Sequence, residues 1–344
     1  MKNFKSLVIF VSLLFFFSCN SPYFSKKQAY KKEFINGFAF VAPPKPFDSL
    51  AFFKIKQTNA NWIAVIPYGF HKYNNPNIKF NADWQWWGET KVGVKQTITD
   101  AKKNGLRVIL KPSIYIPGGN FTGHMKWDSE EEWIVWEESY KKFILEFAAI
   151  AESNNVDLFS IGTENKAAVV ARPNFWLDLI AAVRKVYSGK LTYASNWDEF
   201  EIVPFWNELD YIGVNAYFKL SNKKSPTKET LIKAWETHLP KFSAIAKKYE
   251  KPILFTEYGY LSVDNCAWKT WEIEKNVGSR NINEDCQANA IEALQTVFKN
   301  EPYWAGGILW KWFPNGMGHE GHFKKDYTPQ NKKAEKIITE IFKE

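Results

Sequence analysis

The sequence predicts an α/β protein whose single domain is a (β/α)8 barrel, and three observations lead to this fold class. Short β-rich runs alternate with longer amphipathic stretches along most of the chain. Such alternation indicates βα units and therefore parallel strands. Eight of these runs occur, and eight is the strand number of this barrel.

The expected strands are spaced so that a helix fits between neighbours. They span residues 37–41, 62–70, 107–116, 157–165, 191–197, 211–218, 252–260 and 305–314. A barrel of this kind usually needs about 250 residues, which matches the length between the first and last run. A doubly wound sheet is the alternative fold. It would more often carry a glycine-rich phosphate-binding turn after an early strand, and "GFAFVAPPKP" has no such turn.

Four intervening stretches have clear helical patterns. Residues 90–106 form an amphipathic stretch that stops at Gly105. Residues 130–155 place apolar side chains three to four positions apart, and residues 174–189 and 287–300 follow the same form. These stretches supply the helices that a βα barrel requires.

The N-terminus predicts export and a lipid anchor. A short basic start precedes the apolar core "SLVIFVSLLFFFS", which is too short to span a bilayer well. The following "FFSCNS" resembles the lipobox of bacterial lipoproteins, although Phe16 stands where leucine is usual. We therefore expect a signal peptide over residues 1–18, an acylated Cys19, a polar tether over residues 19–33 and the barrel domain over residues 34–344. The location would be the bacterial cell envelope. An ordinary secreted protein with a soluble mature form is the alternative.

Composition and charge narrow the classes of partner. The formal net charge is +8, yet the lysines are scattered and form no dense basic stripe, so nucleic acid is not an expected partner. Aromatic residues make up 17% of the chain, including 16 tryptophans. Flat aromatic side chains suit the stacking of sugars or bases.

Cys266 and Cys286 are the two cysteines that remain beyond Cys19. In an oxidising compartment such a pair is readily read as one disulfide, and two unpaired thiols are the alternative.

Two glutamates occupy unexpected positions at the ends of strand-like runs. Glu164 follows the apolar residues of 157–165, and Glu257 follows those of 252–260. An unpaired buried carboxylate would be costly inside a strand. In barrel enzymes, however, the catalytic groups lie at the C-terminal ends of the strands, where both side chains can project into the barrel mouth. A protonated and an ionised carboxyl in one cleft are what glycoside hydrolysis needs.

The chain resembles glycoside hydrolase family 113, which is known for β-mannanases. The motifs that carry the resemblance are "SIGTEN", "YIGVNAYF", "FTEYGY" and "DYTPQNKKAEKII", supported by "WWGET" and "LKPSIY", over residues 36–342. The resemblance implies a retaining glycosidase with Glu164 as acid/base and Glu257 as nucleophile. Many members of the wider clan carry asparagine before the acid, where this chain has Thr163.

Three further polar residues are candidates for the site. Tyr217 is placed to hydrogen-bond Glu257, and Asn215 lies two residues away on the same face of the strand. Lys111 is a charge at the end of an apolar strand and needs a partner, either a substrate hydroxyl or a carboxylate. Ordinary barrel packing is the alternative role for these side chains.

Several tryptophans are candidates for sugar contacts. Alternation along the last strand places Trp310 and Trp312 on one face, and a tryptophan there commonly floors the sugar subsite in this clan. Trp197 ends the fifth strand and is expected to line the cleft. Trp87, with Trp84 and Trp86, sits in the loop after the second strand and is expected to form an outer sugar platform, with ordinary packing as the alternative.

We expect a monomer that needs no cofactor and no metal. The histidines of "GHEGH" have no third ligand in the sequence, so this segment is interpreted as a loop near the cleft. The expected substrate is a β-linked glycan, most specifically β-1,4-mannan. A β-glucanase or another β-glycosidase with the same glutamates is one alternative, and a non-catalytic glycan-binding surface lipoprotein is another.

Overall fold

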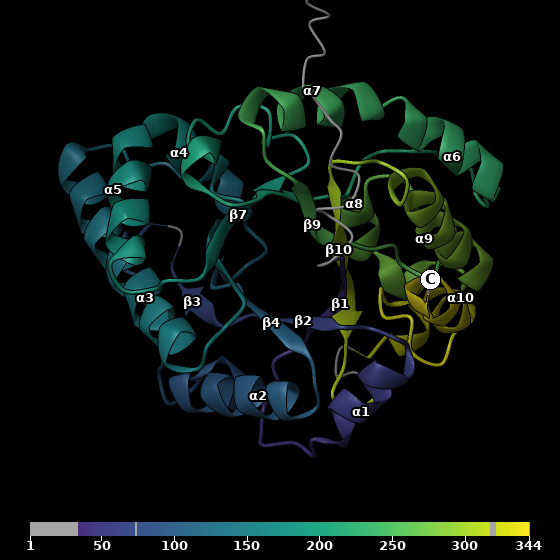
Figure 1. The fold of residues 1–344 in the computed structure, drawn as a ribbon, viewed down its shortest axis with the longest axis horizontal. Coiled ribbons are helices and arrows are strands. Elements are labelled where there is room, and N and C mark those ends of the chain that lie inside the picture. The colour runs from purple at the N-terminus through teal and green to yellow at the C-terminus, as the bar shows by residue number, and fades with distance from the viewer. Residues whose placement is uncertain (1–33, 73, 317–320, 344) are drawn as a thin grey trace, which may run out of the picture.

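A closed barrel of eight parallel strands forms the centre of the molecule (Figure 1). The computed structural model describes residues 34–72, 74–316 and 321–343. The barrel strands are β1 (Ile35–Phe40), β2 (Trp62–Val65), β4 (Arg107–Leu110), β6 (Leu158–Thr163), β7 (Lys190–Asn196), β8 (Ile212–Asn215), β9 (Ile253–Tyr258) and β10 (Trp304–Trp312). They follow one another around the barrel in this order, and β10 closes the sheet against β1. The predicted fold class is confirmed, and each of the eight predicted runs overlaps one barrel strand.

Helices cover the outside of this barrel (Figure 1). They are α1 (Leu50–Gln57), α2 (Lys91–Lys103), α3 (Glu130–Ser153), α4 (Lys166–Ala171), α5 (Pro173–Arg184), α6 (Lys228–Glu236), α7 (Leu239–Tyr249), α8 (Thr270–Glu274), α9 (Glu284–Phe298) and α10 (Lys333–Lys343). The predicted helical stretches correspond to α2, α3, α5 and α9. Between β7 and β8 the described chain has only a 3-10 turn, Trp206–Glu208.

The strands bury both of their faces, as parallel strands covered by helices do. Ile109, Leu158 and Leu254 belong to a cluster that fills the barrel interior. Phe38 and Phe159 belong to the larger apolar layer between strands and helices. The core therefore lies in two concentric layers, one inside the barrel and one between the strands and the helices.

Two predicted strands prove to be discontinuous. The run 62–70 divides into β2 and β3 (Tyr68–Phe70), and the run 107–116 divides into β4 and β5 (Ser113–Tyr115). Pro67 and Pro112 lie at the two breaks, and proline cannot donate a ladder hydrogen bond. β3 and β5 pair with each other outside the barrel and extend the wall of its mouth.

Bulges interrupt three barrel strands near their C-terminal ends. In β6 the residues from Ser160 to Thr163 face a shorter stretch of β7, and β9 has the same irregularity before Glu257. β10 carries an extra residue between Leu309 and Trp312. In β6 the bulge requires a glycine, because a Cβ on Gly162 would lie 2.4 Å from the Tyr140 hydroxyl. Bulges re-aim side chains and are frequent beside active sites.

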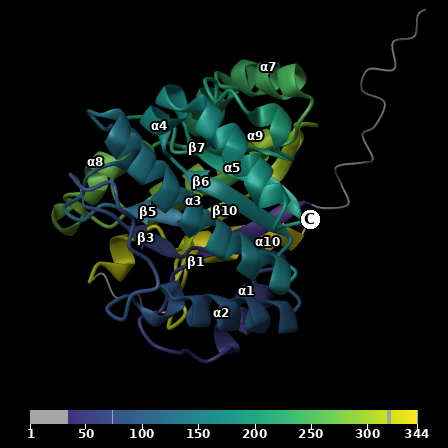
Figure 2. The same ribbon diagram turned by 90° about the vertical axis from the view of Figure 1, so that its left-hand side faces the viewer.

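The two ends of the barrel differ in what they carry. Figure 2 shows β3, β5 and α8 at one end of the barrel and the C-terminus of the chain at the other. The predicted signal peptide (1–18), Cys19 and the tether (19–33) lie outside the described residues. No helix in the described part of the chain is long and apolar enough to cross a membrane.

Candidate active site

Glu164 and Glu257 lie at the same end of the barrel, each just beyond a bulge. Glu164 directly follows β6, and Glu257 is near the end of β9. Two strands, β7 and β8, separate β6 from β9 around the barrel. The carboxyl groups therefore approach the barrel mouth from different sides.

Asn215, at the end of β8, connects the surroundings of the two acids. Its side-chain nitrogen donates to Glu164 Oε1 at 3.0 Å, and its oxygen accepts from the Thr256 hydroxyl at 2.8 Å. Asn215 is also the register partner of Glu257 in the β8–β9 ladder. Because both ends of the amide are engaged, its orientation is fixed with the donor toward Glu164.

Glu257 has a cation and a phenol as partners. Lys111 contacts Glu257 Oε1 as an ion pair, and the Lys111 side chain is only 1% exposed. The Tyr217 hydroxyl donates to Glu257 Oε2 at 2.9 Å. Burial, together with the neighbouring Glu257 charge, raises the pKa of Tyr217 well above its ordinary value, so the phenol stays neutral and donates. A cation and a donor of this kind favour the ionised carboxylate.

Glu164 lacks such a cation contact among the described residues. Burial, followed by repulsion from Glu257, raises the pKa of Glu164 to about 8, and the hydrogen bond from Asn215 only partly offsets this. Glu164 is therefore mostly protonated at neutral pH. Its φ angle of 52° is in the left-handed region, which costs about 1–2 kcal/mol for a residue with a Cβ. Hydrogen bonds from Glu164 N to Ala194 O and from the Thr122 hydroxyl to Glu164 O hold this backbone.

A buried polar network supports the turn that carries Glu164. The Tyr193 hydroxyl accepts from Asn165 N at 2.7 Å and donates to Glu199 Oε1 at 2.6 Å. Glu199 is fully buried, and burial raises its pKa to about 7. This network was not predicted from the sequence, where the acid Glu199, three positions after the fifth barrel strand, is the one signal that could have pointed to it.

The two candidate tryptophans at the end of β10, Trp310 and Trp312, lie on different faces of the strand. Trp310 is half-buried at the barrel mouth, where Lys111 Nζ is 5.9 Å from its ring centroid. Trp312 is 2% exposed and packs on Phe38, with ring centroids 4.8 Å apart, in the layer between strands and helices. The bulge between Leu309 and Trp312 breaks the alternation on which the common face was predicted. The expectation that Trp312 floors a sugar subsite is corrected, because its ring lies in the core.

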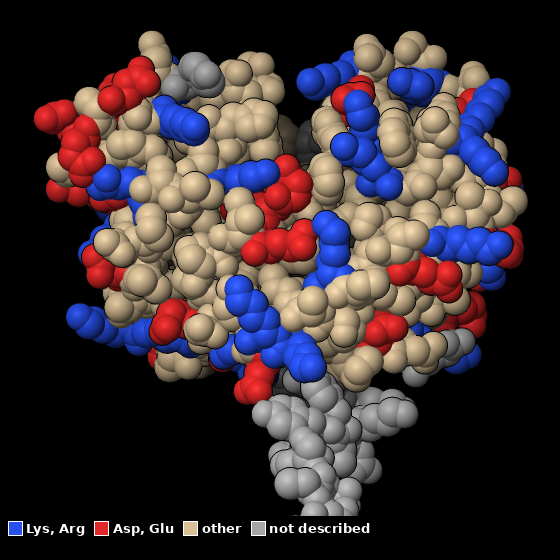
Figure 3. All heavy atoms as spheres, turned by 90° about the horizontal axis from the view of Figure 1, so that it is seen from above, with Lys and Arg blue, Asp and Glu red and all other residues tan. Residues whose placement is uncertain are grey.

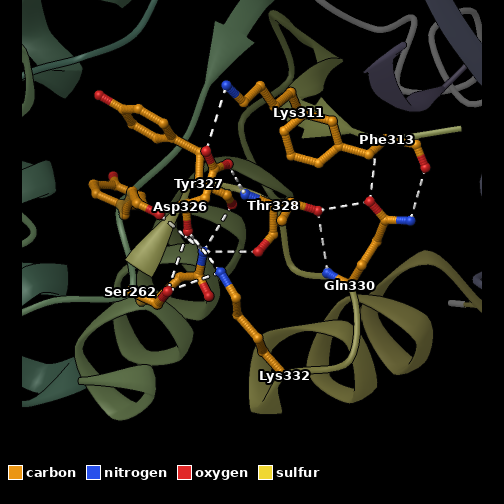
Figure 4. A network of polar contacts seen from close by, with 10 residues as sticks. Ser262, Lys311, Phe313, Asp326, Tyr327, Thr328, Gln330 and Lys332 are labelled. Carbon is orange, nitrogen blue, oxygen red and sulfur yellow. Dashed lines mark hydrogen bonds and ion pairs between the residues drawn. The ribbon is translucent and has the colours of Figure 1, made fainter. Parts of the chain in front are cut away.

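A second polar network begins at Lys311, the residue that follows Trp310 in the chain (Figure 4). Lys311 forms a buried ion pair with Asp326 at 3.5 Å. Lys332 donates to the Asp326 carbonyl oxygen at 2.7 Å and to the Ser262 hydroxyl at 2.8 Å, and burial lowers its pKa to about 8. The side chain of Gln330 pairs with both backbone groups of Phe313. These contacts fix the end of β10 and the segment after Trp310.

The remaining tryptophan candidates differ in position. Trp197 is half-buried and stacks on Trp271, with centroids 5.8 Å apart and an interplanar angle of 16°. Trp87 packs toward Phe47, whereas Trp84 and Trp86 line a cavity of about 490 Å³ beside Trp310. Of the three tryptophans in the expected sugar platform, Trp84 and Trp86 therefore face open space, and Trp87 does not.

Seen from the side of α7, positive and negative side chains are interspersed, and the surface is hollowed at one edge between two halves of the molecule (Figure 3).

A disulfide joins Cys266 and Cys286, whose Cα atoms are 6.0 Å apart, and closes the segment after β9. Within the described residues, no group of three or more His, Cys, Asp and Glu side chains could hold a metal ion. His319 and Glu320 of "GHEGH" lie outside the described residues.

Comparison with known proteins identifies the family. The model of Glycoside Hydrolase Family 113 matches residues 44–332, and the chain belongs to this family and is a glycoside hydrolase. The GH113 β-mannanase AaManA from Alicyclobacillus acidocaldarius superposes with a TM-score of 0.80 and 23% identity over 92% of this chain and 99% of that one. A GH113 β-1,4-mannanase superposes with a TM-score of 0.77 and 25% identity over 90% of this chain and 99% of that one. A β-glucuronidase from Ruminococcus gnavus, at 16% identity and a TM-score of 0.63, shares the fold over 90% of this chain and 50% of its own. No curated protein sequence matches the chain.

Proposed function

We propose that this family 113 member is a retaining glycoside hydrolase that cleaves β-1,4-mannan by double displacement. The observation that carries the proposal is the different surroundings of the two carboxyl groups. Glu257 touches Lys111 and Tyr217, which suits an ionised nucleophile. Glu164 has a pKa of about 8, which suits a proton donor at neutral pH.

The reaction follows from these two states. Glu257 attacks the anomeric carbon and forms a covalent glycosyl ester, while the proton of Glu164 passes to the departing glycosidic oxygen. Glu164, now ionised, takes a proton from water as the water attacks the same carbon and releases Glu257. Two inversions at one carbon restore the starting configuration. Trp310 is the proposed floor for the sugar that reacts, since it lies beside Lys111 in the mouth.

The choice of mannan rests on the family and on the two similar solved structures that are β-mannanases. A panel of β-mannan, β-glucan and β-xylan with sizing of the products tests it. Mannan should be cleaved fastest, and proton NMR should show the β-anomer before mutarotation. Preferred cleavage of glucan would refute the substrate, and early α-anomer would refute the retaining mechanism.

We also propose that the mature chain is a monomer anchored in the cell envelope through an acylated Cys19. The basis is the lipobox-like "FFSCNS" after an apolar core. Mass spectrometry of the N-terminal peptide from membrane fractions should find a lipid on Cys19. An unmodified N-terminus in a soluble fraction would contradict the anchor.

A further inference from the structure

A third buried acid is connected to the candidate site, and the proposed reaction gives it no role. Glu199 lies in the turn that follows β7 and is fully buried. No lysine or arginine in the described part of the chain forms an ion pair with it. Lys166, whose charge acts on Glu199, is itself paired with Asp198 at 2.8 Å. Burying a carboxyl without a cation is costly, so the presence of Glu199 needs an explanation.

Both carboxyl oxygens of Glu199 accept hydrogen bonds, and each bond holds a different turn. The Tyr193 hydroxyl donates to Oε1 at 2.6 Å, and the same hydroxyl accepts from Asn165 N at 2.7 Å. Asn196 N donates to Oε2 at 2.9 Å, at the start of the turn that carries Trp197. Both partners of the carboxyl are donors, which is the pattern of an ionised carboxylate. One buried charge therefore anchors the turn after β6 and the turn after β7.

The peptide that follows Glu164 is the part of its turn that needs support. The left-handed φ angle of Glu164 is unfavourable for a residue with a Cβ. Two successive backbone N–H groups are held from β7, because Glu164 N donates to Ala194 O and Asn165 N donates to the Tyr193 hydroxyl. The phenol accepts best while its own proton goes to Glu199, since hydrogen bonds in a chain polarise one another. Loss of the Glu199 carboxylate should therefore loosen the turn that aims the proton donor.

The charge of Glu199 also acts on the protonation of Glu164. Burial raises the pKa of Glu164 most, the Glu257 charge raises it further, and the Glu199 charge acts in the same direction. The hydrogen bond from Asn215 and the charge of Lys111 lower it. Because ionised Glu199 repels a second negative charge, its removal should lower the pKa of Glu164.

The other ionisable groups around Glu199 do not replace its charge. Burial raises the pKa of both Tyr193, on β7, and Tyr140, on α3, so the two phenols stay neutral. Burial raises the pKa of Glu199 itself to about 7, although the bond from Tyr193 lowers it. Asp198 and Lys166 have smaller and opposite effects on Glu199. The charge lost in a Glu199 variant is therefore that of Glu199 alone.

We propose that Glu199 is a positioning residue for the proton donor, because it holds through Tyr193 the peptide that follows Glu164 and so fixes where the carboxyl points. Its negative charge also opposes the ionisation of Glu164. The inference rests on the proposed function, in which Glu164 gives its proton to the leaving group. It adds to that reaction a residue that acts through another side chain.

Two aryl β-mannobiosides that differ in leaving group test the proposal. E199Q keeps the shape of the side chain but replaces one acceptor oxygen by a donor, so it cannot accept from both Tyr193 and Asn196. Its kcat/KM should fall at least about tenfold more on the phenyl glycoside than on the 2,4-dinitrophenyl glycoside, because only the phenyl leaving group needs a proton. Y193F removes the connecting hydroxyl and should show the same dependence. A purely structural role would lower both values equally.

A matched control is available in the same turn. E201Q makes the same chemical change at an exposed acid two positions along, which pairs with Lys241 at 2.9 Å. It should leave both kcat/KM values as in the wild type. The melting temperature of each variant checks its folding.

A titration without turnover separates this inference from the proposed function. NMR of ¹³C-labelled glutamate carboxyls, with E164Q to assign the signal, measures the pKa of Glu164. E199Q should lower this pKa, and E201Q should not. If the wild type cleaved neither substrate, the proposed reaction would fail while the titration still decided the role of Glu199. Equal losses on both substrates, or an unchanged pKa of Glu164 in a folded E199Q, would overturn the inference.

Discussion

The surroundings of Glu164 and Glu257 differ although the two residues occupy equivalent places in the fold. Each ends a barrel strand just past a bulge. Lys111 and Tyr217 contact the Glu257 carboxylate, whereas the Glu164 carboxyl accepts a hydrogen bond from the amide of Asn215 and has its pKa raised to about 8 by burial. Identical side chains at matching positions can therefore have different neighbours, and the neighbours favour a different role for each.

A single strand end supplies a partner to each acid. Asn215 and Tyr217 are two residues apart, yet the first donates to Glu164 and the second to Glu257. The Asn215 amide is a neutral donor, which can also bond to a protonated Glu164. The Tyr217 phenol adds a hydrogen bond to the ion pair that Lys111 makes with Glu257. The end of β8 thus keeps the two carboxyls distinct, and the following variants test that distinction.

Removing the proposed nucleophile should have the largest effect. E257A should lower kcat by about 10⁴-fold or more, because the variant lacks the carboxylate that forms the ester in the proposed reaction. Added azide should restore turnover and give the α-glycosyl azide. The melting temperature serves as the control for folding. Hydrolysis by E257A at the wild-type rate would show that Glu257 is not the nucleophile.

Removing the acid should have an effect that depends on the leaving group. E164A should lose about 10²- to 10⁴-fold on mannan, whose leaving oxygen needs a proton. An aryl glycoside with an activated leaving group should still form the intermediate, and azide should then give the β-glycosyl azide. Equal losses on both substrates would reject the acid role of Glu164. Formation of the α-glycosyl azide would indicate that the roles of the two glutamates are exchanged.

The phenol should matter less than either acid. Y217F removes one donor from Glu257 and leaves Lys111 in place, so kcat should fall about tenfold. The alkaline limit of activity belongs to Glu164 and should stay near that of the wild type. A rate equal to the wild type would show that the Tyr217 hydrogen bond does not support the nucleophile.

The smallest expected effect is a shift in pH dependence. The proton donor is lost as the pH rises through the pKa of Glu164, so kcat/KM should fall above about pH 8. Asn215 lowers the pKa of Glu164, and its removal in N215A should move this limit upward. A pH–rate profile of both proteins measures the shift. Activity that stayed level to pH 10 in the wild type would contradict the acid role.

Sequence patterns predicted the parts of this molecule that follow strand and helix periods. The eight runs and the acids at their ends could be found because apolar runs that stop at a carboxyl are rare in a core. The bulges could not be found in this way. One added residue does not alter the apolar composition of a strand, but it reverses which face of the sheet each following side chain occupies. Trp312 was misplaced for that reason.

Contacts between distant segments were equally hidden from the sequence. Lys111 meets Glu257, 146 positions further along the chain, and Glu89 shares a cavity with Trp310, only because the barrel closes. The loop that carries Trp84, Trp86 and Trp87 has no helix or strand period. The sequence therefore did not indicate which of these rings face open space.

The parallel direction of the strands has a consequence for how the enzyme would meet a polymer. Ile35 begins β1, so the chain enters the barrel at the end opposite to Glu164 and Glu257. If Cys19 holds the protein to a membrane as proposed, the barrel is attached through the end opposite to these two glutamates, which leaves their end of the barrel free to face away from the lipid. A long glycan could then approach without the bilayer obstructing it.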